Sequence, residues 1–398
     1  MEKNVESIGD RSIEMHRKAG GKIGISLNVP LSSIDDLSLA YTPGVGAVCE
    51  AIHKNPDELR ALTVSGNAVA VVTDGSAVLG LGDIGPRAAM PVMEGKCALF
   101  KALVGIDAWP ICLDAREPDE IVAAIRAIAP GFAGINIEDI SAPRCFEIEE
   151  RLQDLGIPVM HDDQHGTAIV LLAGLLNAVK ATGKDFSSLR VVISGAGAAG
   201  RAIVRLLRCI NLEPGVCTMV GEVIVCDSKG AIHKGRTDLG SVKKAILAYS
   251  NPNDKSGSLR EILAGADVFI GVSKAGLLTS DDVRTMAPDP IVFALANPIP
   301  EIMPDEALAG GAALVATGRS DFPNQVNNVL AFPGIFRGAI DARAPRITDR
   351  MKLVTAKAIA DSVPEPTPEH ILPSALSLEV AAAVAAAVRQ AAIDEKSE

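Results

Sequence analysis

The sequence predicts an α/β protein with two parallel sheets, an N-terminal α/β domain followed by a doubly wound one. Along the 398 residues, short runs rich in β-branched residues alternate with helical stretches, which is typical of parallel α/β layers. One such run, residues 190–194, leads directly into a glycine-rich turn and then a helix. Apolar residues make up 48% of the chain but aromatic residues only 3%, so aliphatic side chains must form most of the core.

The first sheet is expected from apolar runs in the N-terminal part of the chain. These strands should lie near residues 68–74, 108–114, 134–139 and 158–163, with helices near 118–129 and 142–155. A mostly apolar stretch, from Gly166 to Ala181, predicts a long helix that links the two halves.

The second sheet is expected from a further series of apolar runs. They cover residues 190–194, 222–227, 268–272, 291–294 and 313–316. After Arg343 the pattern becomes helical, with a proline-rich break at 364–373 and a final helix over 374–392. We therefore expect domains over residues 1–163 and 164–343, and a C-terminal helical segment over 344–398.

Charge and cysteine content exclude several classes of protein. The formal net charge is -11, without a basic stripe, which argues against nucleic acid and anionic membranes as partners. The seven cysteines are odd in number and lack C-x-x-C spacing, so we expect reduced core thiols rather than a disulfide framework. No signal peptide is recognised, and no apolar run reaches the ~20 residues of a membrane helix. These features predict a cytoplasmic protein.

The glycine-rich turn predicts a Rossmann-type dinucleotide site. Gly195, Gly197 and Gly200 form G-x-G-x-x-G after a strand, and Ala198 and Ala199 open the helix that would point its N–H groups at a pyrophosphate. The alternative is a tight turn without a ligand.

The next strand ends at Asp227, whose carboxylate can bind ribose hydroxyls and repel a 2′-phosphate. We therefore expect NAD rather than NADP, although Asp227 lies farther along the chain than the simple fingerprint places its acid. Lys229 also lies near enough to meet a phosphate. A second G-x-G-x-x-G match, Gly80 to Gly85, has an interrupted strand before it and Pro86 after it, and we interpret it as a close-packed loop on the substrate side.

Three acidic residues at two strand ends predict a site for Mg²⁺ or Mn²⁺. Glu138, Asp139 and Asp163 offer the oxygen ligands that these ions prefer. Neighbouring strand residues point to opposite faces, so Glu138 and Asp139 can share an ion only if the chain leaves strand geometry there. The alternative is helix capping by Asp139 and Asp163. The histidines at 161 and 165 are interpreted as packing or supporting residues rather than zinc ligands.

Two further side chains are candidates for proton transfer. Tyr41 precedes Thr42-Pro43-Gly44, and Lys96 lies beside glycine at the edge of an apolar run. A buried lysine, or one close to a cation, can lose its proton more readily. The alternatives are an amphipathic tyrosine and a lysine whose stem covers apolar surface.

These motifs together resemble the malic enzymes of the small bacterial or archaeal type. The similar segments span nearly the whole chain in the order of the family, and Asn-Asn-x-x-x-Phe-Pro-Gly and the paired acidic motifs are the most specific. They are 41–45, 79–85, 94–96, 137–140, 162–168, 195–200, 296–301 and 327–334.

The resemblance implies oxidative decarboxylation of L-malate to pyruvate and CO₂ with reduction of NAD or NADP, and also decarboxylation of oxaloacetate. It implies that Glu138, Asp139 and Asp163 bind the metal, that Lys96 is the general base and Tyr41 the general acid, and that Asp162 supports the lysine. Further residues are implied to contact substrate or cofactor: Asn297 and Asn328 for the substrate and nicotinamide side, and Thr167 and Ser273 for the cofactor. It also implies a homodimer whose active site borrows groups across the interface.

One departure from the family concerns the substrate carboxylate. Larger members carry an arginine where this chain has Ala77, so another group must meet that carboxylate. Three rival functions remain open: an amino-acid dehydrogenase that needs no metal, a malolactic enzyme that releases lactate, and a non-catalytic nucleotide sensor.

Overall fold

The computed structural model describes residues 7–397 except Leu79 and Pro214, and it contains two sheets. The first sheet is parallel, as the sequence predicts, and its strands have the order β2-β1-β3-β4. Its strands and the helices that follow them are β1 (Ala68–Thr73), α5 (Gly85–Val104), β2 (Asp107–Cys112), α6 (Pro118–Ile128), β3 (Gly134–Ile137), α7 (Arg144–Arg151) and β4 (Val159–His161).

The second sheet has the order β10-β9-β8-β5-β6-β7, in which only β7 is antiparallel. The strand order reverses between β5 and β8, and ligands of doubly wound folds bind in the crevice outside the strand ends at such a point. Its elements are β5 (Arg190–Ser194), α9 (Ala198–Leu207), β6 (Glu222–Asp227), β7 (Gly230–Ala231), α10 (Ser241–Leu247), α11 (Leu259–Leu263), β8 (Val268–Gly271), α12 (Ser280–Arg284), β9 (Ile291–Ala294), α13 (Pro304–Ala309) and β10 (Leu314–Thr317).

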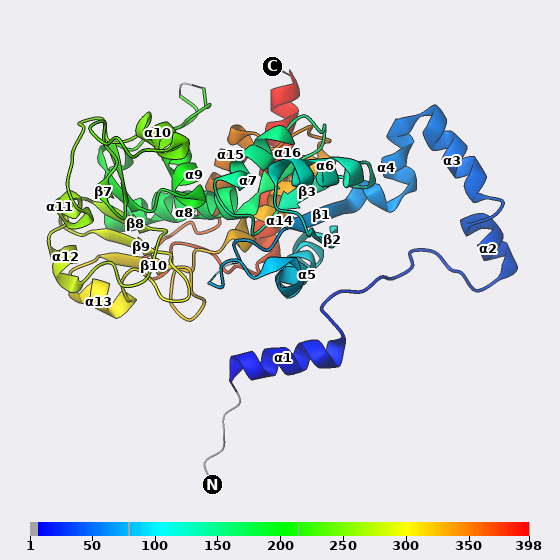
Figure 1. Ribbon diagram of the computed structural model, residues 1–398, viewed down its shortest axis with the longest axis horizontal. Coiled ribbons are helices and arrows are strands. Elements are labelled where there is room, and N and C mark those ends of the chain that lie inside the picture. Colours follow the sequence, from blue (N-terminus) through cyan, green and yellow to red (C-terminus); the bar gives the residue numbers. More distant parts are fainter. Residues whose placement is uncertain (1–6, 79, 214, 398) are drawn as a thin grey trace, which may run out of the picture.

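Helix α8 (Asp162–Thr182) connects the two sheets and packs against α9 and α15 (Figure 1). By length and composition it could cross a membrane, which corrects our expectation that no segment would. However, 72% of its apolar stretch is buried inside the protein, and a core helix has the same composition. Its apolar character is therefore explained by its position between the two halves.

Three C-terminal helices cover the junction of the two sheets: α14 (Phe332–Asp341), α15 (Asp349–Asp361) and α16 (Leu378–Ser397). Glycines bring α14 against α16, since a Cβ at Gly338 would lie 2.4 Å from the carbonyl oxygen of Ala385. The predicted final helix begins four residues late, because the chain turns after Pro373.

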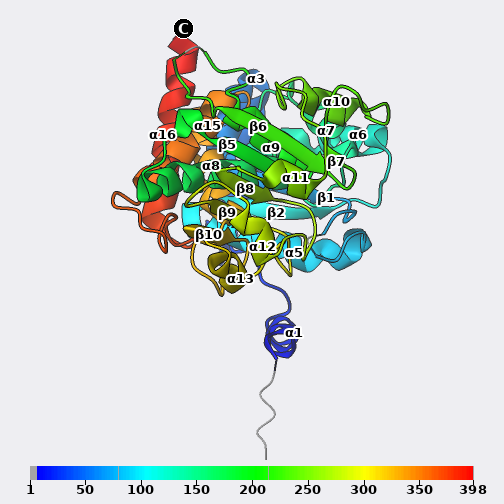
Figure 2. The ribbon, with the colours of Figure 1, turned by 90° about the vertical axis from the view of Figure 1, so that its left-hand side faces the viewer.

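An N-terminal arm, which we define as residues 7–62, leaves the body of the molecule (Figures 1 and 2). Its α-helices have no buried residue: α1 (Ile8–Ala19), α2 (Ile34–Ala40), α3 (Val45–Lys54) and α4 (Leu59–Leu62). Short 3-10 helices occur at η1 (Pro56–Glu58), η2 (Val64–Asn67), η3 (Ala129–Gly131), η4 (Phe186–Ser188) and η5 (Asn328–Leu330). The sequence motifs did not predict this extended arm.

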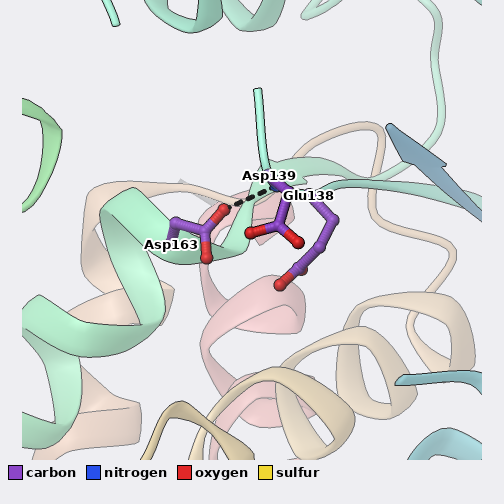
Figure 3. A group of neighbouring side chains, drawn as sticks. All are labelled: Glu138, Asp139 and Asp163. Carbon is purple, nitrogen blue, oxygen red and sulfur yellow. Dashed lines mark hydrogen bonds between the residues drawn. The ribbon is translucent and has the colours of Figure 1, made fainter. Parts of the chain in front are cut away.

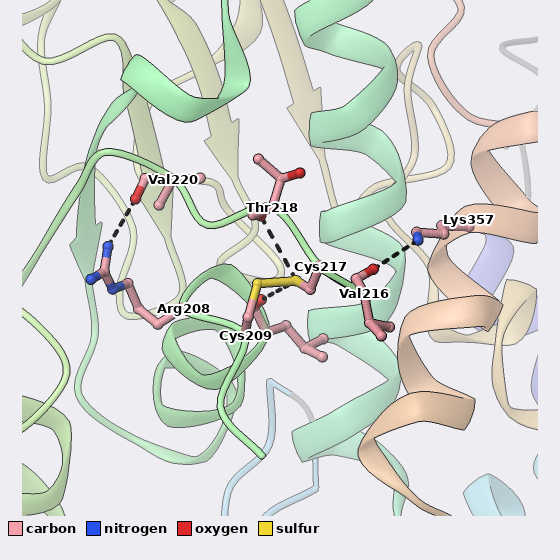
Figure 4. The surroundings of a disulfide bond; sticks show 8 residues. Arg208, Cys209, Val216, Cys217, Thr218, Val220 and Lys357 are labelled. Carbon is pink, nitrogen blue, oxygen red and sulfur yellow. Dashed lines mark hydrogen bonds between the residues drawn. A yellow bond between two sulfur atoms is a disulfide. The ribbon is translucent and has the colours of Figure 1, made fainter. Parts of the chain in front are cut away.

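Cys209 and Cys217 form a disulfide after α9, with sulfur atoms 2.06 Å apart (Figure 4). The prediction of reduced thiols is wrong for this pair, because the fold brings together two cysteines that no spacing rule connects. Lys357 Nζ of α15 donates to the carbonyl of Val216 in the same loop (3.2 Å). The thiols of Cys97, Cys145 and Cys226 fit the expected core role, and burial raises the pKa of each to about 12.

Candidate functional site

Glu138, Asp139 and Asp163 form one acidic cluster (Figure 3). One oxygen from each can be chosen so that all three lie within 4.8 Å of one another. The chain leaves strand geometry at this point, as it must if Glu138 and Asp139 are to share an ion: β3 ends at Ile137, and Asp139 has a left-handed φ of 52°. The Asp139 N–H donates to Asp163 Oδ2 (2.8 Å), which ties this turn to the first turn of α8.

The alternative of helix capping finds little support in this arrangement. Helix α7 begins at Arg144, five residues after Asp139, and the N-cap of α8 is His161, which makes no side-chain cap. Asp163 does lie in the first helical turn, where a carboxylate interacts favourably with the helix dipole. That position leaves its oxygens available to face the other two acids.

Lys96 reaches the cluster from α5. Its side chain is only 10% exposed, its Nζ lies 3.0 Å from Glu138 Oε1, and it also forms an ion pair with Asp162. The ammonium lies over the ring of Phe332, 4.3 Å from the centroid. Burial acts to lower the pKa of Lys96, but the charges of Asp162 and Glu138 outweigh it and raise the pKa. In this arrangement, therefore, Lys96 carries its proton.

The cluster holds more negative charge than Lys96 can balance. Burial is the largest cause that raises the pKa of Glu138 well above its usual value, and the charge of Asp163 adds to it. Burial also raises the pKa of Asp162 to about 6, although Lys96 opposes that shift. Three converging carboxylates with surplus negative charge suit a hard divalent cation, so the donor set fits Mg²⁺ or Mn²⁺.

Several residues that the sequence analysis did not select support the cluster. Asn136, fully buried on β3, donates its Nδ2–H to Glu138 Oε2 (3.0 Å). Glu149 accepts the His161 N–H (3.0 Å) and pairs with His165, so both histidines act as supports. Because side chains alternate along a strand, Asn136 was expected on the same face as Glu138. This alternation is the sequence feature that could have predicted the contact.

The glycine turn lies at the switch point between β5 and β8. Gly195 has a φ of 128°, and a Cβ there would lie 2.6 Å from the carbonyl oxygen of Val272. A Cβ at Gly200 would lie 2.0 Å from the Gly195 carbonyl oxygen, whereas one at Gly197 would meet nothing within 4 Å. The first and third glycines are thus required by packing, and the second leaves open space where a pyrophosphate would approach. Ala198 and Ala199 begin α9, as expected.

Ser273 and Asn297 follow the neighbouring strands β8 and β9. Ser273 Oγ lies 3.1 Å from Ser194 Oγ, which places it beside the glycine turn. The buried carboxylate of Glu301 accepts the N–H groups of Ser273 (2.9 Å) and Ala296 (3.0 Å), joining the loops after the two strands. Glu301 belonged to a recognised motif, but nothing in its sequence context revealed this role.

Asp227 ends β6, where the sequence placed it, but its carboxylate is already bound by cations. Arg236 donates to both oxygens (2.8 and 2.9 Å), and Lys243 donates to Oδ2. Burial acts to raise the pKa of Asp227, but the hydrogen bonds from Arg236 and Lys243 outweigh it and lower the pKa to about 2. The end of β6, where we expect the ribose to bind, therefore carries the basic groups of Arg236 and Lys243 as well as the acid Asp227.

Thr167 and Asn328 lie close to the acidic cluster. Thr167 is four residues after Asp163 on α8, so both lie on one face of the helix, the less buried one. Asn328 is adjacent to Asp162, because a Cβ built at Gly166 would lie 2.8 Å from Asn328 Cβ and 2.1 Å from Asp162 Oδ1.

The loop after β1 also packs against this site. The Ala77 N–H donates to the carbonyl of Asp139 (3.0 Å), and a Cβ at Gly80 would lie 3.7 Å from Pro298. The second glycine motif therefore lies between the acidic cluster and the Asn297 loop. Leu79, part of the same recognised motif, is outside the described residues.

Tyr41 is the predicted site residue that the structure does not bring into the cluster of its own chain. It ends α2 in the N-terminal arm and is 66% exposed. Figure 1 shows α2 beyond the body, at the end opposite the second sheet.

Comparison with known proteins gives the family. The model of the malic enzyme N-terminal domain matches residues 21–117 and 115–153, and that of the malic enzyme NAD-binding domain matches residues 164–393.

Individual relatives match over nearly the whole chain. An NAD-dependent malic enzyme of Geobacillus stearothermophilus is 53% identical, over 98% of this chain and 80% of the relative. A bifunctional malic/malolactic enzyme of Bacillus subtilis is 51% identical, over 98% and 94%. The crystal structure of the NAD-dependent malic enzyme of Thermotoga maritima is similar with a TM-score of 0.90 and 47% identity, over 95% of this chain and 98% of that one. Other relatives are named NADP-dependent malic enzymes. With both domain models matched and the same fold found in a solved relative, the chain belongs to the malic enzyme family.

Proposed function

We propose that this chain oxidises and decarboxylates L-malate to pyruvate and CO₂, with reduction of NAD or NADP, at a divalent-cation site formed by Glu138, Asp139 and Asp163. The observation that carries the proposal is the convergence of these acids with the Lys96–Asp162 pair. A metal-independent dehydrogenase or a nucleotide sensor would not require so much buried charge in one place.

A cation bound by the three acids would hold the hydroxyl and carboxylate oxygens of malate and stabilise the negative charge that develops during decarboxylation. It would also offset the carboxylate charges that now hold the proton on Lys96. The deprotonated Nζ of Lys96 would then accept the proton of the substrate hydroxyl, and a dinucleotide bound at the glycine turn would accept the hydride from the carbon that carries this hydroxyl. Asp162 keeps the lysine in place, and the glycine turn fixes the dinucleotide.

The second candidate product is lactate. The Bacillus subtilis relative is named a bifunctional malic/malolactic enzyme. The overall conversion of malate to lactate and CO₂ needs no external oxidant or reductant. If NADH stays bound after CO₂ leaves, it can return its hydride to pyruvate, so that malate yields lactate and CO₂ without net reduction of cofactor. Measurement of pyruvate and lactate beside NADH separates the two outcomes.

We further propose that the N-terminal arm docks on a second copy of the chain and supplies Tyr41 to its site. The arm exposes large apolar side chains, among them Ile25 (81%), Leu27 (71%), Ile34 (82%) and Leu39 (77%). Apolar surface of this extent favours association, and a two-fold dimer would use both arms equally. Docking would bring Tyr41 from solvent to a position where its hydroxyl can protonate the enolate carbon.

The test of the proposed activity is malate turnover with NAD and NADP in parallel, with Mn²⁺ or with EDTA. We expect cation-dependent loss of malate with formation of pyruvate or lactate. Absence of turnover under every condition, or turnover that EDTA leaves unchanged, would contradict the proposal.

A further inference from the structure

A cavity of about 800 Å³ is lined by none of the residues proposed to bind metal, substrate or dinucleotide, although Glu149 and His165, which support the acidic cluster, form part of its wall. Its walls come from α7, the start of α8, α9, the loop after α9, residues 344–352 and the end of α16. Gln164 in this wall directly follows the cluster residue Asp163, and Arg201 directly follows Gly200 of the glycine turn. The cavity therefore shares helix α8 with the acidic cluster and helix α9 with the dinucleotide turn.

The lining is rich in charged residues and has a small positive surplus, although the chain as a whole is acidic. Six of its 24 residues are lysine or arginine and five are aspartate or glutamate, against 38 and 49 of 398 in the whole sequence. One carboxylate of the lining is already neutralised, because Asp349 pairs with Arg205 (3.0 Å) and Lys352 (3.2 Å). Buried Glu149 contacts His165 (3.0 Å), but burial lowers the pKa of His165, so the neutral imidazole leaves Glu149 with its negative charge.

Two arginines at the cavity have no carboxylate partner among the described residues. Arg201 stacks on the ring of Phe146, with 4.7 Å between its guanidinium carbon and the ring centroid. Arg346 is exposed, makes no hydrogen bond or ion pair with the part of the chain that the structure describes, and lies just before α15, whose N-terminus adds a positive partial charge. Glu150, Glu213 and Glu395 also line the cavity, so the positive surplus is only one charge. The two guanidinium groups without a carboxylate partner therefore decide where an anion would bind.

We propose that this cavity binds a small polyanion, carrying two or more carboxylate or phosphate groups, between Arg201 and Arg346. Guanidinium groups bind both kinds of group in bidentate fashion. An occupant would contact α9 immediately after the dinucleotide turn and α8 immediately after the acidic cluster. The site is thus placed to change the affinity of the neighbouring site for its ligands.

The test is a calorimetric titration of the metal-free protein at constant ionic strength. Citrate and inorganic pyrophosphate, titrated separately, distinguish a carboxylate ligand from a phosphate ligand. The variants Arg346→Glu and Arg201→Gln remove the two proposed contacts. Arg389→Glu on α16 is the matched control, because Arg389 is exposed and lies outside the cavity.

We expect at least one of the two anions to bind, with affinity about tenfold or more weaker in Arg346→Glu and in Arg201→Gln and unchanged in Arg389→Glu. No binding of either anion, or equal weakening in the control, would overturn the proposal. Because the readout is binding without malate or metal, its failure is distinct from failure of the proposed activity.

Discussion

At the residue scale, the proposed chemistry depends on Lys96 and the acids around it. Replacement of Lys96 by alanine removes the proposed base while leaving the acidic cluster in place. We expect kcat to fall about a hundredfold or more, since general bases contribute on that order. Mn²⁺ affinity should hold or increase, because a nearby positive charge has been removed.

The matched control is Lys101→Ala, an exposed lysine on the same helix that pairs with Asp107. Steady-state kinetics of both variants, with calorimetric titration of Mn²⁺, check the prediction. A Lys96→Ala enzyme with undiminished turnover would exclude Lys96 as the base.

The buried acids also predict how pH affects the stability of the metal-free protein. The pKa of Glu138 is raised and that of Asp162 lies at about 6, so the folded state binds these protons more tightly than the unfolded state. Their contribution to stability is therefore present at low pH and is lost as pH rises through the raised pKa values. A bound cation removes this penalty, since it favours the ionised form of its ligands.

We therefore expect the stabilisation by Mn²⁺ to increase as pH rises from about 5 to about 8. Thermal unfolding with Mn²⁺ and with EDTA across this range measures it. In Glu138→Gln the increase should be much smaller. A stabilisation that is independent of pH in the native sequence would argue against buried carboxylates as the ligands.

The acids and the lysine were predictable one by one, because their types and positions after apolar runs are visible in the sequence. The residues that hold these side chains in place were harder to predict. Asn136 and Glu149 contact the cluster through side chains, and Asp139 enters a left-handed turn, all of which depends on how β3, α7 and α8 meet. Such contacts join residues far apart in the sequence, and no local pattern encodes them.

At the scale of elements, we expect the end of β6 to decide between NAD and NADP. Asp227 would repel a 2′-phosphate, but it also holds Arg236 and Lys243, which would attract one. The substitution Asp227→Asn removes the negative charge and keeps the shape of the side chain. It also releases Arg236 and Lys243 from their ion pairs with Asp227, so that both can bind a 2′-phosphate. We expect kcat/KM with NADP to rise relative to NAD by about tenfold, the effect of roughly 1.4 kcal/mol.

Glu222→Gln, at the opposite end of the same strand, is the control for loss of an ion-paired acid. Kinetics with both cofactors measure the ratio for each variant. A ratio that Asp227→Asn leaves unchanged would show that the other residues around the ribose set cofactor choice.

Strand and helix positions were largely predictable, because β-branched runs and glycine turns report local structure. The sequence analysis placed β1, β3, β5 and β8 within two residues at either end, and it expected α8 as the connecting helix. The disulfide and the late start of α16 were not predicted, since each depends on packing between distant segments. The division into domains at residues 163 and 343 stays a prediction.

At the scale of the whole molecule, the exposed arm predicts shared active sites. A mixture of Tyr41→Phe and Lys96→Ala chains, unfolded and refolded together, should form mixed dimers in which one site receives an intact Tyr41 and an intact Lys96. Random pairing would restore about a quarter of native turnover. Each variant alone should stay nearly inactive.

Native mass spectrometry on the same samples establishes that the mixed dimers form, because the two variant chains differ in mass. If they form and activity does not return, Tyr41 does not act across the interface. The sequence analysis expected a dimer only by resemblance, because no local motif reports an arm whose apolar side chains lack a partner within their own chain.

The most direct test of the account is the position of the cation itself. Crystals grown with Mn²⁺ and malate, measured at a wavelength where manganese scatters anomalously, would locate the ion without reference to the protein model. We predict one strong peak bound by oxygens of Glu138, Asp139 and Asp163 and by malate, with Lys96 Nζ close to the substrate hydroxyl. A peak elsewhere, or malate bound away from these three acids, would contradict the central claim.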